Sequence, residues 1–141
     1  MNSVRVMAFV PKVFLGSPYL NGAKICDCIE QAKSKRVDMV LFPKNCLRGD
    51  SLGDLAHFPD MEEAEEIALD LVLKASESFS GGIVFGKDEN HLYIRGGVIQ
   101  KVFENEPALI DGVQYISAAN PAEALGLYKT ENQIKQMSLL C

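Results

Sequence analysis

The sequence has few of the residues and patterns that mark membrane, secreted or metal-binding proteins. It contains no tryptophan, two histidines and four cysteines among 141 residues. No apolar run approaches the roughly 18 residues that a membrane-spanning helix needs. The stretch Met1–Val10 also lacks the ordered basic, apolar and small-residue regions of a signal peptide. We therefore expect a cytoplasmic protein that makes no contact with membranes.

Positive charge is scarce as well. Lysine and arginine total 14 against 19 aspartates and glutamates, which gives a net charge of −5 and a pI near 5.0. A chain of this kind, without a basic cluster, is a poor candidate for binding the phosphate backbone of nucleic acids. Hydrophobic residues make up 48% and charged residues 23%, an ordinary balance for a globular protein. Because 141 residues suit one domain, we expect a single domain over residues 1–141.

The cysteines and histidines do not form a metal-binding pattern. Cys26 and Cys28 have one residue between them, whereas zinc-binding pairs have about two to four. His57 and His91 have no potential ligand at a suitable spacing. We predict no metal site and no cofactor, and we expect the cysteines to remain thiols in a reducing compartment.

Strand and helix patterns alternate through the first half of the chain. Val4–Val10 and Met39–Phe42 are apolar runs of strand length, and Asn21–Arg36 carries apolar residues at helical spacing. A second helix is predicted from Asp60, an N-cap with Glu63 as its capping-box partner, to about Phe79. Its predicted buried stripe consists of Ala64, Ile67, Ala68, Leu71 and Ala75. The glutamates between positions 62 and 66 are interpreted as a solvated helix start, not as a metal or acid–base site.

The second half contains shorter patterns. Strands are predicted at Ile83–Phe85, Leu92–Val102 and Tyr115–Ser117, and turn residues fill Lys87–Asn90. Gly96-Gly97 is interpreted as a bulge or a close backbone approach. The stretch from Pro121 to Leu140 has sparse helical spacing and is predicted to be helical. The order strand, helix, strand, helix, strand is typical of an α/β domain.

One long stretch, Val4–Leu55, resembles the start of the nitrilase, or carbon–nitrogen hydrolase, superfamily. In that family a strand ends in Phe-Pro-Glu and leads into a Leu-(Thr/Ser)-Gly-Tyr turn. Here Met39–Asp50 reads MVLFPKNCLRGD, and Ser51–Leu55 continues as SLGDL, which is most similar to the glutaminase domain of glutamine-dependent NAD⁺ synthetase. Further matches resemble the family's next strand, its hairpin and a segment beyond its catalytic cysteine: Gly82–Gly86, Leu92–Tyr93 with Gly97–Ile99, and Ala108–Val113 with Ser117–Pro121.

The resemblance implies a partial nitrilase-like α-β sandwich. Family domains have four layers, α-β-β-α, and this chain holds about half of one, since the middle of the domain is lacking. A truncated sheet exposes an edge or an apolar face that a partner can cover. We therefore expect a homodimer, the simplest such arrangement, or a complex with a partner subunit.

The resemblance also implies which residues fill the catalytic positions. Family catalysis uses a Glu general base, a Lys that stabilises the tetrahedral intermediate and a Cys nucleophile. Lys44 occupies the Glu position, and a protonated lysine has no acceptor lone pair. Lys101 is the lysine nearest the expected position but lacks the Pro-Lys context. No Cys-Glu-Asp occurs: Cys46 matches a structural position of the motif, and Cys141 is the last residue.

Three hypotheses about function remain open. The first is a non-catalytic protein related to the synthetase glutaminase domain that acts by ligand binding or protein assembly. The second is an enzyme with rebuilt chemistry, in which Lys44 lowers the pKa of a nucleophilic Cys46. The simpler interpretation of Cys46 is a small buried apolar residue. The third is a subunit of a carbon–nitrogen hydrolase whose catalytic residues a partner supplies.

A residual ligand site is expected at the C-terminal ends of the strands, near Lys44, Asn45 and Ser117. Lys44 favours a small anionic ligand there. The simpler interpretation of Lys44 is an ion pair with Asp50 or Asp54. Arg48, in the same stretch, is predicted to be a solvated loop residue.

Overall fold

The computed structural model describes residues 5–104, 108–110, 113–118 and 135–140, with side chains described in the first of these ranges. Strands and helices alternate at first, as the sequence predicts, and strands follow. Their bounds are β1 (Val6–Ala8), α1 (Pro18–Ser34), β2 (Met39–Leu41), the 3₁₀ helix η1 (Gly53–His57), α2 (Pro59–Ser76), β3 (Gly82–Lys87), β4 (Asn90–Arg95), β5 (Val98–Phe103), β6 (Ala108–Ile110), β7 (Val113–Ala118) and β8 (Lys135–Leu140).

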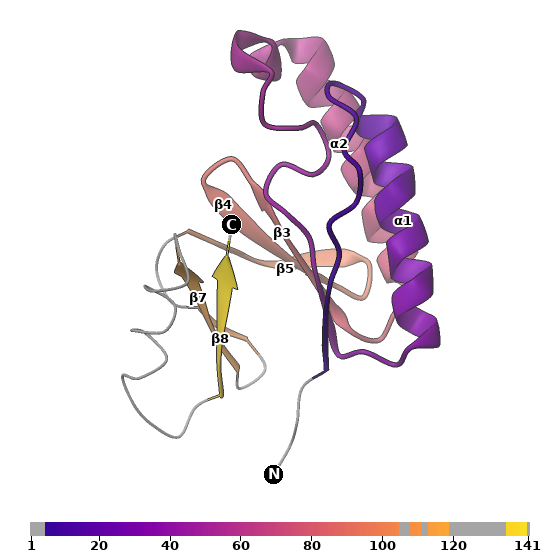
Figure 1. Ribbon diagram of the computed structural model, residues 1–141, viewed down its shortest axis with the longest axis vertical. Coiled ribbons are helices and arrows are strands. Elements are labelled where there is room, and N and C mark those ends of the chain that lie inside the picture. The colour runs from indigo at the N-terminus through magenta and orange to yellow at the C-terminus, as the bar shows by residue number, and fades with distance from the viewer. Residues whose placement is uncertain (1–4, 105–107, 111–112, 119–134, 141) are drawn as a thin grey trace.

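These strands form two sheets. The first has the order β1-β2-β3-β4-β5, with β1, β2 and β3 parallel and with antiparallel pairs from β3 to β5. The second has the order β6-β7-β8. Figure 1 shows α1 and α2 together on one side of the five-stranded sheet and β7 and β8 on the other. The fold class is therefore α/β. Its three layers are the helices, the five-stranded sheet and the second sheet, which is part of an α-β-β-α arrangement.

The core lies between the two helices and the five-stranded sheet. Gly22 of α1 allows close packing with α2, because a Cβ at Gly22 would lie 3.2 Å from the Cβ of Ala68. The fully buried members of this core include Ile25, Ile29, Val40, Val72, Ile83 and Ile94. At about 25 cal/mol per Å² of apolar surface, such burial is the main favourable contribution to folding.

Helix α1 begins at Pro18, three residues before the predicted start, and ends at Ser34. Proline suits the first turn of a helix because its missing N–H would have no intrahelical acceptor there. Asn21 is consequently inside the helix, and its buried side chain binds two loops. Its amide donates to the carbonyls of Phe14 (2.8 Å) and Leu47 (2.7 Å) and accepts from the Phe14 N–H (2.7 Å).

The predicted capping box at Asp60 and Glu63 is wrong. Helix α2 begins one residue earlier, at Pro59, with Phe58 as its N-cap and no capping hydrogen bond from a side chain. The φ and ψ of Phe58 are −72° and 138°. A residue before proline is driven into this extended region by steric contact with the proline ring, so Pro59 sets the start of the helix.

The predicted buried stripe of α2 is also partly wrong. Ala68 is buried, but Ile67 is 54% exposed and Leu71 36% exposed. The residues that face the core are Glu65, Ala68, Val72 and Ser76. The helix is thus rotated relative to the apolar pattern, because a buried glutamate occupies a core-facing position.

Two tight turns connect β3, β4 and β5. The first lies at the predicted turn Lys87–Asn90, where Asp88 has a φ of 54°. The second is Gly96-Gly97, with φ values of 64° and 83°. The predicted bulge is therefore not at this pair, which forms a two-residue hairpin turn with both residues at positive φ. A close approach is nonetheless present, because a Cβ at Gly97 would lie 2.6 Å from Cγ of Glu77.

The largest error in the prediction concerns the end of the chain. The helix predicted for Pro121–Leu140 is wrong over its last six residues, which form β8 and pair in parallel with β7. Pairing with another strand overrides a sparse helical pattern. The prediction for residues 119–134 lies outside the described residues. The strand predicted at Tyr115–Ser117 is confirmed within β7, and β6 was not predicted.

Candidate functional site

The segment that follows β2 contains the residues singled out from the sequence. Its backbone is held by neighbouring elements: the Phe42 N–H donates to the Val84 carbonyl (2.9 Å) and the Asn45 N–H to the Gly86 carbonyl (2.7 Å). Asn45 has a φ of 51°, in the left-handed region that asparagine tolerates better than most residues. The carboxyl end of β2 therefore delivers Lys44 and Asn45 to a defined position beside β3.

Lys44 is partly exposed at this edge of the sheet. Its ammonium lies 3.8 Å from the carboxylate of Glu89, in the turn between β3 and β4. The predicted ion pairs of Lys44 with Asp50 or Asp54 are not found within the described residues. The Asp50 carboxylate instead accepts a hydrogen bond from Asn45 (2.7 Å). Gly86 allows Lys44 to lie against β3, since a Cβ there would be 3.1 Å from Cγ of Lys44.

Asn45 has a structural role that the sequence did not reveal. Its side-chain amide donates to Asp50, and its side-chain carbonyl accepts from the backbone N–H of Asp88 (2.8 Å). Asn45 thus ties the loop after β2 to the turn between β3 and β4. Its polar atoms are directed at the protein.

Cys46 is buried and faces the helices. Its side chain is 1% exposed and belongs to the core. Burial, more than any neighbouring charge, raises the pKa of the Cys46 thiol to about 12. Burial and the charge of Asp27 also raise the pKa values of Cys26 and Cys28. Cys141 lies outside the described residues.

The prediction for Arg48 is wrong: Arg48 is a buried residue, not a solvated one. Its guanidinium binds two carboxylates, Glu65 of α2 at 3.2 Å and Asp88 at a shorter distance. Burial alone would lower the pKa of Arg48, but the hydrogen bonds and charges of Asp88 and Glu65 raise it. The Nε of Arg48 is buried without a hydrogen-bond partner among the described residues.

Glu65 corrects the interpretation of the acidic run as wholly solvated. Glu65 is 1% exposed, and besides Arg48 it has Lys87 at 4.0 Å. The signal in the sequence was its spacing: Glu65, Ala68 and Val72 lie at i, i+3 and i+7, which is one face of a helix. A glutamate on a core-facing position requires a buried cation, and Arg48 supplies it.

His91, on β4, is a further buried titratable residue close to this site. Its ring lies against Phe103 with ring centroids 5.2 Å apart. Burial, and secondly the positive charge of Lys44, lower the pKa of His91 below 6.5. His91 is therefore neutral at pH 7.

The described residues support only part of the predicted ligand site. Lys44 and Asn45 are adjacent, but the side chain of Ser117 lies outside what the structure describes, although its backbone is part of β7. No group of three or more potential metal ligands occurs within the described residues. Likewise, no helix in the described part of the chain is long and apolar enough to cross a membrane.

Comparisons with known proteins identify the fold. No protein-family model and no curated protein matches the sequence. The structure is similar to a glutamine-dependent NAD⁺ synthetase from Acinetobacter baumannii, with a TM-score of 0.69, 18% identity and coverage of 92% of this chain and 30% of that one. The chain has a nitrilase-like fold.

Other nitrilase-like structures agree. An amidase from Nesterenkonia sp. matches with a TM-score of 0.65 and 12% identity, over 81% of this chain and 54% of that chain. A carbon–nitrogen hydrolase from Helicobacter pylori matches with a TM-score of 0.56 and 10% identity, over 94% of this chain and 48% of that chain. The chain therefore spans between about a third and about half of the length of these proteins. Identities this low show the fold alone.

Removal of the Arg48 guanidinium is expected to destabilise the protein strongly. Arg48→Met leaves Glu65 buried without its closest cation, which should cost about 3–5 kcal/mol in the free energy of unfolding measured with urea. The double variant Arg48→Met/Glu65→Leu should recover much of this loss. Lys33→Met, which breaks the more exposed 2.5 Å ion pair with Glu30, is the control and should change stability by less than about 0.5 kcal/mol. Equal losses of stability in Arg48→Met and Lys33→Met would contradict the conclusion that the Arg48–Glu65 pair is a buried structural ion pair.

His91 should make stability depend on pH in a specific direction. Below pH 6.5 His91 is protonated in the unfolded chain but not yet in the folded chain, where its pKa is lower. The free energy of unfolding therefore falls with falling pH until the pKa of the folded state is passed. Thermal melting between about pH 7.5 and 5.5 should show this fall in the original protein and less of it in His91→Gln. His57→Gln is the control for the replacement of a histidine at an exposed position. An NMR titration that places the pKa of His91 at or above 6.5 would reject the explanation.

Proposed function

We propose that this chain is a nitrilase-fold protein without amidase activity that acts by ligand binding or by protein assembly. The observation that carries the proposal is Lys44, which stands where the motif of the NAD⁺ synthetase glutaminase domain has its general base. A protonated lysine cannot accept the proton of a thiol or a water. Its nearest described carboxylate, on Glu89, is 87% exposed and is not a buried base.

The state of the thiols supports the same conclusion. Burial raises the pKa of Cys46 to about 12, so the thiol and not the thiolate is the form present at pH 7. A nucleophilic sulfur must also contact the carbon of the amide substrate. Cys46 is buried in the core and offers no such contact. These properties weigh against the hypothesis that Lys44 activates Cys46 as a nucleophile.

Lys44 instead has the properties of a small-anion site. It is partly exposed, and its ion pair with Glu89 at 3.8 Å is solvated, so this pair contributes little energy and can be replaced by a ligand. Asn45 contributes to such a site by holding the loop, because its own polar atoms bind Asp50 and Asp88. Ser117 remains the proposed contribution of the second sheet.

The absence of amidase activity can be tested directly. Pure protein incubated with glutamine and with simple aliphatic amides should release no more ammonia than a blank, because Lys44 stands at the position of the general base and the three described thiols have raised pKa values. Lys44→Glu should not create activity, since it restores only one of three catalytic roles. Saturable ammonia release that disappears in Cys46→Ser or in Lys44→Met would overturn the proposal.

Assembly is the second candidate, and the edge strand β5 favours it. Among the described strands β5 has a neighbour on one side only, and Val98, Ile99 and Val102 are 55%, 38% and 52% exposed. Ile99 pairs with Ile94 and Val102 with Leu92, and Gln100 between them is bulged out of register. The bulge places Ile99 and Val102 on the same face of the sheet, next to an open edge. A second copy can pair there, and so can a partner subunit of a carbon–nitrogen hydrolase that supplies catalytic residues.

The β5 edge makes a prediction about oligomeric state. Native mass spectrometry should find a homodimer that Val102→Lys converts to a monomer, because charge on an edge strand opposes strand pairing. Ile67→Lys is the matched control: Ile67 is 54% exposed on α2 and is not part of the edge strand, and its variant should stay dimeric. A monomeric original protein, or a monomer produced equally by both variants, would exclude assembly through β5.

A further inference from the structure

The two helices of the structure lie side by side and run in the same direction. A Cβ at Gly22 of α1 would lie 3.2 Å from the Cβ of Ala68 of α2. Four residues further along α1, the thiol of Cys26 donates to the carbonyl of Leu71 (3.7 Å), three residues further along α2. Both contacts follow the line along which the helices meet, on one side of the five-stranded sheet (Figure 1).

Large apolar side chains are exposed next to this line. Ile67 and Leu71 of α2 are 54% and 36% exposed, and Tyr19 of α1 is 68% exposed. Tyr19 lies one turn before Gly22, and Ile67 is next to Ala68, so these exposed side chains flank the contact on its solvent side. We call Tyr19, Ile67 and Leu71 the helical face. Two of its residues belong to the apolar stripe that the sequence predicts to be buried, but no described element covers them.

The negative charge of the protein is concentrated on the same two helices. Together α1 and α2 contain eight aspartates and glutamates against three lysines, a net charge of −5. The whole chain also has a net charge of −5, so the remaining 11 acidic and 11 basic residues cancel. Only Glu65 among the eight is buried, and the other seven are exposed. The helical face is therefore apolar surface within an acidic surrounding.

Stabilisation of the helices accounts for only part of this charge. Asp60 and Glu62 lie in the first turn of α2, where carboxylates interact favourably with the helix dipole. Glu66 and Asp70 lie beyond that turn, and each is next in the sequence to a residue of the helical face. Neither forms an ion pair within the described residues. Their carboxylates are available to a partner with positive charge.

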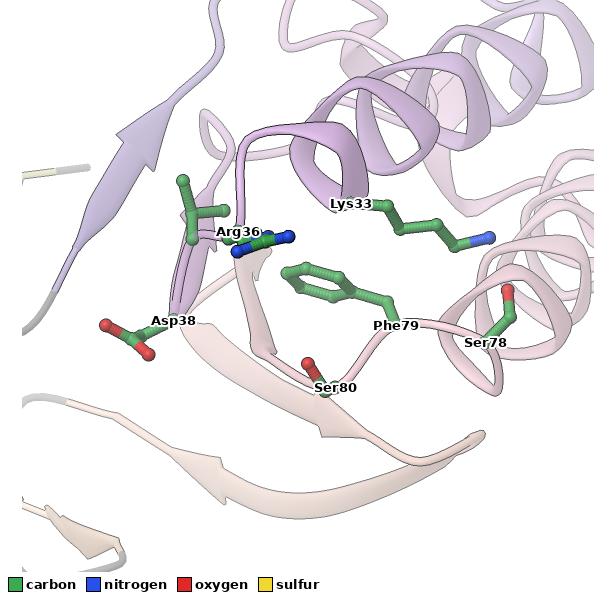
Figure 2. A pocket seen from close by; sticks show the side chains of 7 residues that line it. Lys33, Arg36, Asp38, Ser78, Phe79 and Ser80 are labelled. Carbon is green, nitrogen blue, oxygen red and sulfur yellow. The ribbon is translucent and has the colours of Figure 1, made fainter.

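Most of the cations of these helices lie at the opposite ends from this acidic surface. Lys33 and Lys74 are in the last turns of α1 and α2. Figure 2 shows Lys33 and Arg36 where α1 ends. The ammonium of Lys33 is already paired with Glu30 (2.5 Å). The charge thus changes along the helices, and the residues of the helical face precede these cations.

The nature of this surface selects one kind of occupant. A second copy of the chain would bring the same negative charge to the interface, and like charges that face each other oppose association. The backbone groups of α1 and α2 are bonded within each helix, so a partner has to recognise side chains. An amphipathic helix does so by laying its apolar stripe against exposed apolar residues.

We propose that the helical face binds a cationic amphipathic helix of a partner protein. The apolar stripe of the partner packs on Tyr19, Ile67 and Leu71, and its lysines or arginines pair with Glu66 and Asp70. This surface is independent of Lys44 and of the absence of amidase activity.

The test is an NMR titration of the full chain with three peptides of about 18 residues, a length similar to that of α1 and α2. The first has leucine at helical spacing and lysine elsewhere. The second has the same composition in an order that forms no apolar stripe, and the third has glutamate in place of lysine. The first should shift the amide signals of residues 19–26 and 63–71 saturably. The second should bind at least about tenfold more weakly, and the third should not bind.

Three results would overturn the proposal. One is equal affinity of the first two peptides, which would show attraction by charge alone. Another is the absence of a saturable shift with the first peptide. The third is a dependence of the same signals on protein concentration without peptide, which would show that a second copy covers the helical face.

Two variants distinguish the helical face from general charge. Ile67→Lys should lower the affinity for the first peptide at least about tenfold, because it places a cation in the apolar contact. Its melting temperature should stay close to that of the original protein, since Ile67 is exposed. Val102→Lys is the matched control, with the same change of charge at a similarly exposed residue of β5, and it should keep the affinity. Equal losses of affinity in both variants would contradict binding at the helical face.

Discussion

The buried ion pair between Arg48 and Glu65 joins parts of the chain that are distant in the sequence. Arg48 lies in the loop after β2, Glu65 in the second turn of α2, and Asp88, the second partner of Arg48, in the turn between β3 and β4. Removing such charges from water costs several kcal/mol, which the attraction between the paired charges has to offset. The position of α2, the course of the loop and the β3–β4 turn are therefore mutually dependent. A displacement of the loop or of α2 would separate the two buried charges of Arg48 and Glu65, and Asp88, which is 45% exposed, adds a second carboxylate from the turn.

This dependence determines the character of the candidate site. The four residues from Asn45 to Arg48 are all buried, so this part of the loop is attached to the protein by its side chains, whereas the preceding Lys44 is partly exposed. A loop held in this way presents one cation in a fixed place. The same packing keeps the Cys46 side chain 1% exposed, so this thiol is closed to a ligand in the structure.

The fold was predictable where local pattern and tertiary structure agree. The apolar runs at Met39–Phe42 and Ile83–Phe85 are strands because they are buried on both faces of the sheet, and the hairpin turns follow from Asp88 and the paired glycines. Prediction failed where tertiary contacts decide. Glu65 displaced the apolar stripe of α2, Pro59 displaced the capping box, and pairing with β7 made a strand of β8.

The candidate site was likewise predictable where a local motif decides and not where tertiary contacts decide. The position of Lys44 at the end of β2 followed from the motif and the rule for α/β sheets. The burial of Arg48 did not, because the sequence showed neither its partner on α2 nor its partner on the β3–β4 turn, 17 and 40 residues away.

The distribution of exposed apolar surface limits how a partner can complete this partial sandwich. Val84 and Tyr93 pair across β3 and β4 on the face away from the helices, and they are only 3% and 2% exposed. That face of the sheet is therefore already covered. Among the described strands of this sheet, β1 and β5 are the two edges, and Ile99 and Val102 lie on the same face at the β5 edge. The assembly proposed through β5 would therefore extend the sheet and would not cover a bare face.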